Sequence, residues 1–404
     1  MPTLSETLRQ RGFAYQFSSE NLEEITDGPK RAVYLGVDPT ADSIHAGNLA
    51  GYMLLRHFAD AGHRVILLIG GGTGMIGDPK PDVERPLVSP EVVAERAQKL
   101  AAQANQLLGG EVEVVNNADW LVHLNLLDFL RDIGKHFTVN NLMKKDAIAK
   151  RLESEEGITY TEFAYPLLQA YDFWHLFTTR GVDVQISGSD QWGNVTAGID
   201  LIRRKEGKTA YALTMPLITD KATGKKFGKS EGNAVWLDPT MTSPFEFYQF
   251  WLNGSDESVE DYLKIFTLLP LESIAEGIRE QQANPGARAA QKLLASEVTA
   301  LVHGAQTAAS VAAASSALFG EAAIDGSTAE LLRVQAPTLA VREGDSLVDV
   351  LVASSLASSK REVRQFLADG AVTLNGAKVD ESRVISNEDF QHGIALLKRG
   401  KRHA

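Results

Sequence analysis

Residues 32–69 read AVYLGVDPTADSIHAGNLAGYMLLRHFADAGHRVILLI, and this stretch decides the fold of the first part of the chain. Its apolar run at residues 32–37 predicts a buried strand, which the Asp-Pro-Thr sequence at residues 38–40 ends. A helix is expected from about residue 47 to residue 61, and residues 65–69 predict the next strand. A strand, a helix and a strand at this spacing form a βαβ unit, so we expect a parallel sheet.

Outward from this unit, the pattern of apolar residues divides the chain into four parts. Further strands are predicted at residues 112–115 and 182–186, with helical stretches between them, which indicates a doubly wound, Rossmann-like α/β domain. After Asp238 the pattern becomes helical, and Ser243 and Glu246 predict a capped helix start. The predicted parts are the α/β domain at residues 1–222 with a helical insertion at about 120–165, a lysine loop with a helical domain at 223–325, a linker at 326–345 and a small α+β domain at 346–404.

The last part, residues 346–404, is predicted to contain two helices and a hairpin. Ser346 is expected to cap the first helix, and Ser359 with Glu362 predicts a capping box for the second. The sequence Asn375-Gly376 between two short apolar runs is a strong signal for a tight hairpin.

The charge of the chain is unevenly distributed. The net charge is −12, but residues 346–404 carry nine Lys and Arg against seven Asp and Glu. Lys360, Arg361 and Arg364 share the polar face of the second helix in this part. A basic module on an acidic body is typical of local RNA binding, although a solvated helix face would show the same pattern. We expect these three cations to contact RNA, and the second interpretation stays open.

The composition excludes several classes of protein. The chain has no cysteine, which rules out disulfides, Cys-ligated zinc and thiol catalysis. No metal site is expected, because the sequence has no His-Glu-x-x-His motif and His57 with His63 has no metal-ligand spacing. The first 26 residues do not follow a signal-peptide pattern, and the longest apolar run, at residues 65–69, is too short to cross a bilayer. We therefore expect a cytoplasmic protein without a membrane partner.

Two distant motifs are predicted to hold phosphate. His45-Ala46-Gly47-Asn48 opens a helix, where unpaired N–H groups and the positive end of the helix dipole attract anions. Alone, His45 would be interpreted as a helix cap. However, Lys226-Phe227-Gly228-Lys229-Ser230 supplies two lysines on a glycine-containing loop further along the chain. Neither motif contains a covalent nucleophile beside an evident base, so together they indicate that bound ATP is attacked.

Two glycine-rich stretches match nucleotide-binding motifs but fail on context. Residues 72–77 satisfy Gly-x-Gly-x-x-Gly, yet Asp78-Pro79 follows at once and discourages the helix that a dinucleotide site requires. Residues 224–230 place three residues between glycines where a P-loop has four. NAD binding and a Walker-type ATPase are therefore not predicted, and the first glycines are expected to let the backbone approach a ligand.

The two phosphate motifs resemble the signatures of the class I aminoacyl-tRNA synthetases. Residues 34–41 (YLGVDPTA), 169–172 (QAYD) and 188–194 (GSDQWGN) are closely similar to bacterial tyrosyl-tRNA synthetases. Residues 346–404 resemble the S4-like RNA-binding domain of that family, so the resemblance extends from about Tyr34 to the end of the chain.

Three features depart from the family pattern. Asn48 stands where many relatives have His, and Phe227-Gly228 stands where the general pattern has Met-Ser, although both variants occur among tyrosyl enzymes. The loop at residues 79–85 departs further, so pyrophosphate contacts are not assigned to Lys80 and Arg85.

The resemblance implies a role for each matched residue. Tyr34 and Asp172 would hydrogen-bond the phenol of tyrosine. The other residues implied at the amino acid are Asp78, Tyr165 and Gln169 at its ammonium group, Asn117 and Gln191 close by, and Gln185 behind them. The residues implied along ATP are Asp38, Thr40, His45, Gly47, Asn48, Gly188, Asp190, Lys226 and Lys229. The implied catalytic residues are Thr40, His45, Lys226, Lys229 and Ser230.

The expected activity is that of a tyrosine–tRNA ligase. The tyrosine carboxylate, already ionised at neutral pH, would attack the α-phosphate of ATP, and tRNA(Tyr) would then accept the tyrosyl group. Mg²⁺ would accompany the phosphates, and no tightly bound cofactor is expected. The family also implies a homodimer formed through residues 126–163. The alternatives are a tryptophanyl-type enzyme, a non-catalytic RNA-binding relative, and an ATP-dependent ligase for another small acid.

Overall fold

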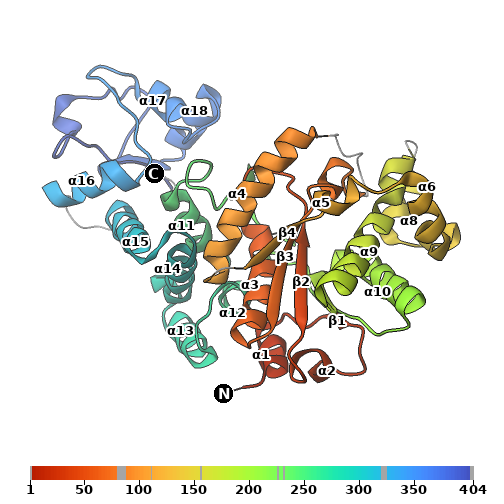
Figure 1. The fold of residues 1–404 in the computed structure, drawn as a ribbon. Coiled ribbons are helices and arrows are strands. Elements are labelled where there is room, and N and C mark those ends of the chain that lie inside the picture. The colour runs from red at the N-terminus through yellow and green to blue at the C-terminus, as the bar shows by residue number, and fades with distance from the viewer. Residues whose placement is uncertain are drawn as a thin grey trace. The chain divides into compact units, whose positions relative to one another are not determined.

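The structure is a computed structural model that describes residues 2–79, 88–110, 112–154, 157–224, 227–230, 233–319 and 325–400. The side chains of Asp146, Lys229, Ser230 and Asn233 are not among the described parts. The chain forms two compact units, Met1–Asp238 with Glu257–Glu276, and Pro239–Asp256 with Gly277–Ala404 (Figure 1). The sequence predicts residues 257–276 within the helical domain, whereas they pack with the first unit.

The first unit is built on a six-stranded sheet in the order β1-β6-β5-β2-β3-β4. The strands are β1 (Gln16–Phe17), β2 (Ala32–Val37), β3 (Arg64–Ile69), β4 (Glu113–Asn116), β5 (Val184–Gly188) and β6 (Tyr211–Met215). All neighbouring strands from β6 to β4 are parallel, which confirms the predicted sheet. Only β1 is antiparallel, pairing with β6 at the edge, and the sequence pattern predicted neither β1 nor β6. The strand order reverses between β5 and β2, which makes their carboxyl ends the expected binding edge.

Helices cover both faces of this sheet. Helices α3 (Ala46–Asp60) and α4 (Pro90–Leu108) lie on one face, and α9 (Tyr160–Arg180) and α10 (Trp192–Glu206) lie on the other (Figure 1). Tyr34, Ile66 and Leu68 alternate along β2 and β3 and pack against α9 in one buried cluster. The remaining helices of this unit are α1 (Leu4–Arg11), α2 (Glu23–Thr26), α5 (Ala118–Leu121), α6 (Leu126–Asp132), α7 (Val139–Leu142), α8 (Asp146–Glu153) and α12 (Val259–Phe266).

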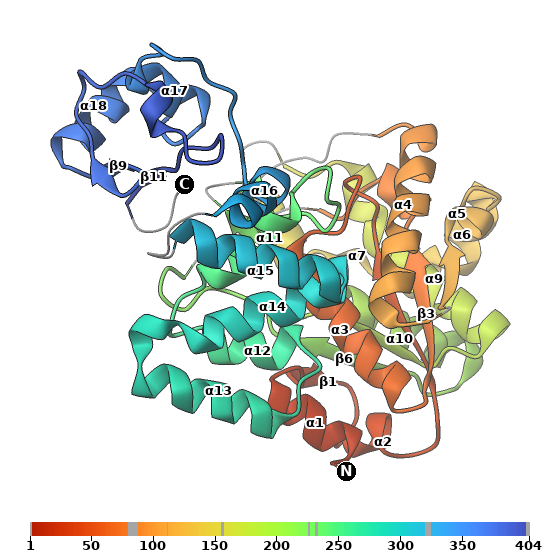
Figure 2. The same cartoon turned by 90° about the vertical axis from the view of Figure 1, so that its left-hand side faces the viewer.

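The second unit combines a helical part with a small α+β part. Its helices are α11 (Pro244–Leu252), α14 (Ala289–His303), α15 (Ala305–Phe319), α16 (Gly326–Gln335), α17 (Leu347–Ala353) and α18 (Lys360–Ala368), while α13 (Leu271–Ala283) begins in the first unit. Helices α11, α14 and α15 pack side by side (Figure 2). The predicted capping box at Ser243 and Glu246 is present.

The α+β part contains the predicted hairpin and one strand that the sequence did not predict. Strands β9 (Val372–Leu374) and β10 (Ala377–Lys378) flank Asn375 and Gly376, whose φ angles of 50° and 83° fit a tight hairpin turn. Strand β11 (Leu397–Arg399) pairs with the other edge of β9. Part of the basic tail is therefore a strand, because its backbone completes this sheet.

Two predicted helix caps differ in detail. Ser346 precedes α17, but its side chain makes no capping hydrogen bond. Ser359 Oγ accepts from the Glu362 N–H at 3.3 Å as predicted. The Glu362 carboxylate, however, accepts from Ser358 N and Ser358 Oγ rather than from Ser359, each at 2.6 Å. The reciprocal half of the box is therefore formed with Ser358, one residue before the helix cap.

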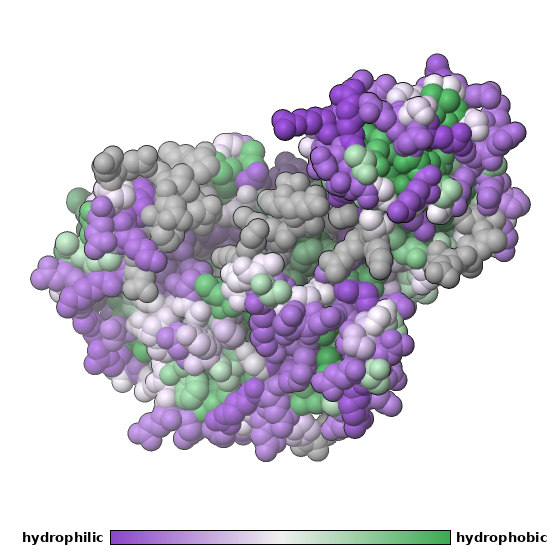
Figure 3. Space-filling model, turned by 180° about the vertical axis from the view of Figure 1, so that it is seen from behind, coloured by the Kyte–Doolittle hydropathy of each residue, from purple (hydrophilic) through white to green (hydrophobic). Residues whose placement is uncertain are grey.

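Polar and charged residues cover most of the face seen in Figure 3, and hydrophobic residues form separate patches on it. Among the described helices, none is long and apolar enough to span a bilayer.

Candidate functional site

The two predicted phosphate motifs meet in the first unit. A Cβ placed on Gly228 would lie 2.4 Å from the Gly47 nitrogen, and Gly228 has a φ of 97° that favours glycine. Val235 N donates to Gly228 O at 3.1 Å, and Ala46 N donates to Val235 O at 2.8 Å. Backbone hydrogen bonds through Val235 therefore join the two motifs, which are far apart in the sequence. The backbones of Gly47 and Gly228 approach so closely that neither position has room for a Cβ.

His45 is the N-cap of α3, which confirms that this motif opens the helix. Its Nδ1 accepts a hydrogen bond from the Gly47 N–H at 3.0 Å. In the neutral ring the proton must then reside on Nε2, which is left as the donor. The ring packs edge-on against Trp236 at 5.8 Å, and Asn48 is exposed in the first turn of the helix.

The lysines of the second motif are only partly described. Strand β7 (Lys229–Ser230) pairs with β8 (Asn233–Ala234), which fixes the backbone that follows Gly228. Lys226, like Lys80 and Arg85, lies outside the described residues.

Asp38 lies at the carboxyl end of β2 and is held by two hydroxyl groups. Thr73 Oγ1 donates to its Oδ1 at 2.7 Å, and Tyr165 OH donates to its Oδ2 at 2.8 Å. Burial and the neighbouring Asp38 raise the pKa of Tyr165 well above its ordinary value, so the phenol stays a donor. A Cβ on Gly70 would fall 2.0 Å from Asp38 Oδ1, which explains a glycine at this point of the glycine-rich stretch.

Gly188 ends β5, and Asp190 follows it at the same edge of the sheet. Asp190 belongs to a 3₁₀ turn at Ser189–Gln191, and a Cβ on Gly188 would lie 2.6 Å from Asp190 Oδ1. Thr40 is exposed after β2. These positions lie at the switch point of the sheet, where ligands bind in doubly wound folds.

A buried polar group lies beneath this edge at Asp172 on α9. Asp172 is 1% exposed and accepts from Asn117 Nδ2 at 2.8 Å and from Trp120 Nε1 at 2.7 Å. Burial raises the pKa of Asp172 to about 7, although these two hydrogen bonds lower it. The sequence did not predict a role for Trp120. The only sequence signal for it is that it lies three residues after Asn117 at the start of α5, which places both side chains on the same side of the helix.

Three buried polar atoms near Asp172 lack a hydrogen-bond partner among the described residues. They are Tyr34 OH, Gln169 Oε1 and Gln185 Oε1. Tyr34 and Gln185 are register partners on β2 and β5, so their side chains point to the same face of the sheet. On α9, residues 165, 169 and 172 lie on one helix face. Because buried polar groups are normally satisfied, these atoms indicate that a polar ligand enters here.

Asp78 is bound by amide donors from the start of α10. Gln191 Nε2 donates to Asp78 Oδ2 at 2.8 Å, and Asn194 Nδ2 donates to Asp78 Oδ1 at 3.1 Å. Lys145 Nζ donates to the Gly193 carbonyl, and burial lowers the pKa of Lys145 to about 8 against the opposing effect of Asp78. Sequence reasoning gave no role to Asn194 or Lys145, because their partners are remote in the chain.

The predicted RNA-binding cations are on the exposed face of α18. Lys360 Nζ lies 2.5 Å from Asp349 Oδ1, and Arg364 Nε lies 2.6 Å from Glu381 Oε1. Arg361 is exposed. Ion pairs this exposed contribute little, so the paired cations remain accessible to a stronger anionic partner.

Comparison with known proteins identifies the family. The model of the class I tRNA synthetases for tryptophan and tyrosine matches residues 26–320, well over half of the chain. The chain belongs to this family. A second model, the SYY-like C-terminal domain of tyrosine–tRNA ligases, matches residues 329–403.

Relatives of this class I synthetase span its whole length. A tyrosine–tRNA ligase 2 of Enterococcus faecalis is 46% identical, over 98% of this chain and 97% of its own. A tyrosine–tRNA ligase of Streptomyces coelicolor is 45% identical, over 100% and 98%. These matches confirm the resemblance to bacterial tyrosyl-tRNA synthetases.

Solved structures agree with the fold. A C-terminally truncated mitochondrial tyrosyl-tRNA synthetase of Aspergillus nidulans superimposes with a TM-score of 0.70 at 31% identity, covering 77% of this chain and 93% of that one. A tryptophanyl-tRNA synthetase of Plasmodium falciparum, at 14% identity and a TM-score of 0.55, covers 75% of this chain and 84% of that one and shares the fold.

Proposed function

We propose that this chain is an ATP-dependent tyrosine–tRNA ligase. It activates L-tyrosine as tyrosyl-adenylate and transfers the tyrosyl group to the 3′ end of tRNA(Tyr). The observations that carry this assignment are the backbone contact of the His45 motif with Gly228 and the buried polar side chains of Tyr34 and Asp172 in the same unit. The relatives that match the full length carry the same activity in their names.

The slot distinguishes tyrosine by its hydroxyl group. Tyr34 OH has no partner among the described residues, and Asp172 is a buried acceptor, so a phenol between them satisfies both. An amino acid without the hydroxyl would leave these groups buried and unpaired. A tryptophan side chain has no oxygen to place there, which favours tyrosine over the tryptophanyl alternative.

The amino group of the substrate is proposed to lie between Asp78, Tyr165 and Gln169. Gln191 and Asn194 orient the Asp78 carboxylate, whose negative charge attracts an ammonium group. Gln169 Oε1 is a buried acceptor without a partner among the described residues, and an ammonium group would supply three donors. Asn117 acts through Asp172, and Gln185 lies beside Tyr34 on the next strand.

The chemical step needs positioning and charge stabilisation rather than a base. The substrate carboxylate attacks the α-phosphate in line, and pyrophosphate leaves. His45 Nε2–H, Thr40 and the N–H groups at the start of α3 are proposed to donate to the phosphates. Lys226, Lys229 and Ser230 are proposed to bind the leaving pyrophosphate, while Asp38, Gly47, Asn48, Gly188 and Asp190 contact the rest of ATP.

Mg²⁺ is proposed to arrive with ATP. Within the described ranges, no group of three or more His, Asp and Glu side chains could hold a metal ion by itself. The ion would therefore be coordinated mainly by phosphate oxygens, where it offsets charge on the leaving group.

A homodimer and cytoplasmic location are further parts of the proposal. Leu126 and Leu127 on α6 are 69% and 74% exposed, and Leu130, Val139 and Met143 are also exposed in this segment. Exposed apolar side chains in such number within residues 126–163 fit a protein–protein interface. Lys360, Arg361 and Arg364 are proposed to contact tRNA.

Tyrosine-dependent exchange of pyrophosphate into ATP tests the assignment. Each of the twenty amino acids is supplied in turn with MgATP, and exchange is expected with tyrosine alone. Exchange with tryptophan would favour the tryptophanyl alternative, and no exchange with any amino acid would favour a non-catalytic RNA-binding relative.

A further inference from the structure

Phe227 is one of the two residues at which the lysine motif departs from the general Met-Ser pattern, and the structure shows which side chains it contacts. Its ring centroid lies 4.6 Å from that of Tyr262 and 5.1 Å from that of Phe266, the latter ring being nearly parallel at 27°. Its N–H donates to Ile218 O at 3.0 Å. Tyr262 and Phe266 are buried on one face of α12, so Phe227 closes a cluster of three rings.

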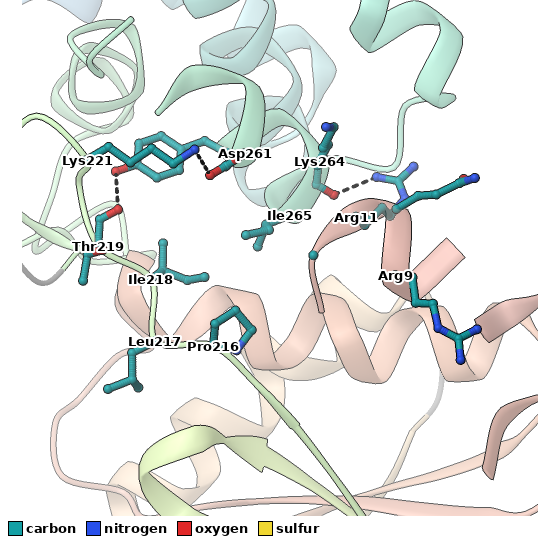
Figure 4. Close-up of a pocket in the computed structure, with 13 residues that line it drawn as sticks. Arg9, Arg11, Pro216, Leu217, Ile218, Thr219, Lys221, Asp261, Lys264 and Ile265 are labelled. Atoms are coloured by element: carbon teal, nitrogen blue, oxygen red, sulfur yellow. Dashed lines mark hydrogen bonds and ion pairs between the residues drawn. The ribbon is translucent and has the colours of Figure 1, made fainter. Parts of the chain in front are cut away.

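Helix α12 also contacts α1, through Arg11 at the end of α1. Arg11 is 6% exposed, and its guanidinium donates to the carbonyl of Lys264 (Figure 4) and to those of Thr267 and Leu269, which follow the end of α12. Carbonyls at the end of a helix lack intrahelical partners, so these hydrogen bonds stabilise the carboxyl end of α12. The carboxyl end of α12 is therefore anchored to α1 by a buried side chain.

The same helix also holds the segment that leads into the lysine motif. Lys221 N donates to Ser258 Oγ at 2.8 Å, Lys221 Nζ pairs with Asp261 at 2.6 Å, and Tyr262 OH donates to Thr219 O at 3.4 Å. These contacts border a cavity of about 270 Å³ between α1, residues 216–221 and α12 (Figure 4). The polar contacts and the ring cluster attach this segment to α12 along one wall of the cavity.

We propose that α12 positions the lysine motif for the reaction at the ATP phosphates, and that Tyr262 and Phe266 are positioning residues because their rings pack against Phe227. This inference rests on the proposed ligase function. Phe227 is bonded on one side to Lys226 and on the other to Gly228, which packs directly on Gly47 at the start of α3. A shift of the Phe227 ring therefore also displaces Gly228 and the backbone of Lys229, which follow it directly in the chain. Displacements of about 1 Å can cost about 100-fold in rate when catalysis depends on positioning.

The test compares Tyr262→Leu and Phe266→Leu with a matched control, Phe58→Leu. Phe58 is equally buried in the first unit, but it lies 12 residues beyond Ala46 along α3, about 18 Å from the motif contact. In single turnover with saturating tyrosine and MgATP, we expect the two α12 variants to form adenylate about 10- to 100-fold more slowly. Their dissociation constants for tyrosine, measured by equilibrium dialysis, should stay within about twofold of the wild type because the tyrosine slot is untouched. Tyr262→Phe keeps the ring and should restore most of the rate.

A second readout separates failure of this inference from failure of the proposed function. Trypsin cleaves after lysine, and cleavage after Lys229, in strand β7, can be followed by mass spectrometry without any substrate. We expect faster cleavage there in Tyr262→Leu and Phe266→Leu than in Phe58→Leu at equal stability in urea. If adenylate rate and cleavage match those of Phe58→Leu, the positioning role is overturned. A wild-type chain without exchange activity but with the expected cleavage pattern would instead overturn the ligase assignment alone.

Discussion

The ionisation of Asp172 leads to a prediction whose size follows from its surroundings. Burial raises the pKa of this carboxyl from 3.8 to about 7. The pKa of Asp172 is higher in the folded chain than in the unfolded chain, so protonation favours the folded state. This contribution to the free energy of unfolding is fully present below about pH 4. It is lost as the pH rises through about 7. One pKa unit corresponds to about 1.4 kcal/mol, so the total loss is about 4 kcal/mol.

Asp172→Asn removes this ionisation and therefore changes stability in a pH-dependent way. At pH 8 the variant avoids a cost of about 4 kcal/mol. It also turns one acceptor oxygen into an amide donor facing the N–H of Asn117 or Trp120, which costs about 1–3 kcal/mol. We expect a net gain in the free energy of unfolding of about 1–3 kcal/mol at pH 8. Between pH 8 and pH 5 this gain should fall by about 3 kcal/mol, because Asp172 is already protonated at pH 5 in the folded protein.

Urea unfolding at pH 5 and pH 8, followed by tryptophan fluorescence, measures this difference. Trp120, Trp174, Trp192 and Trp236 all lie in the first unit, so the signal reports mainly on the unit that contains Asp172. Asp200→Asn, on the exposed side of α10, is the control and should change little with pH. A stability difference for Asp172→Asn that is the same at both pH values would refute the burial argument.

The same variant should bind tyrosine more weakly. The phenol loses a charged acceptor, and a hydrogen bond to a charged group contributes about 1.5–3 kcal/mol. The dissociation constant should therefore rise about 10- to 150-fold. A variant that is more stable at pH 8 but binds its substrate poorly would show that the buried carboxylate is retained for recognition at the expense of stability.

Three further outcomes are expected. Lys229→Ala should slow adenylate formation far more than it weakens tyrosine binding, and equal losses would remove its role at the phosphates. Gly228→Ala should reduce exchange activity about as much as Lys229→Ala, because its Cβ would lie 2.4 Å from the Gly47 nitrogen and Gly228 has a φ of 97°. Gly224→Ala is the control and should reduce exchange activity less, because the space around Gly224 is open. Truncation after residue 345 should spare tyrosine-dependent exchange but impair tRNA charging, and full charging by the truncated chain would contradict an RNA role for the last domain.

Much of the fold follows from local sequence patterns. The apolar run at residues 32–37, the helix after His45 and the run at 65–69 were enough to predict a parallel sheet, because period and spacing depend on neighbouring residues. Short elements escaped this reasoning. Strands β1 and β11 have two and three residues, and each exists because an established strand offers it a free edge.

The site shows the same division. The sequence predicted the two phosphate motifs, and its resemblance to the family predicted the polar residues at the amino acid and the class of reaction, since these depend on which side chains are present and in what order. Only the tertiary structure showed that Gly228 lies on Gly47, that Trp120 donates to Asp172, and that Phe227 is gripped by Tyr262 and Phe266. Such contacts join residues from about 35 to about 180 positions apart, and their geometry depends on how whole helices and strands pack, which no local pattern encodes.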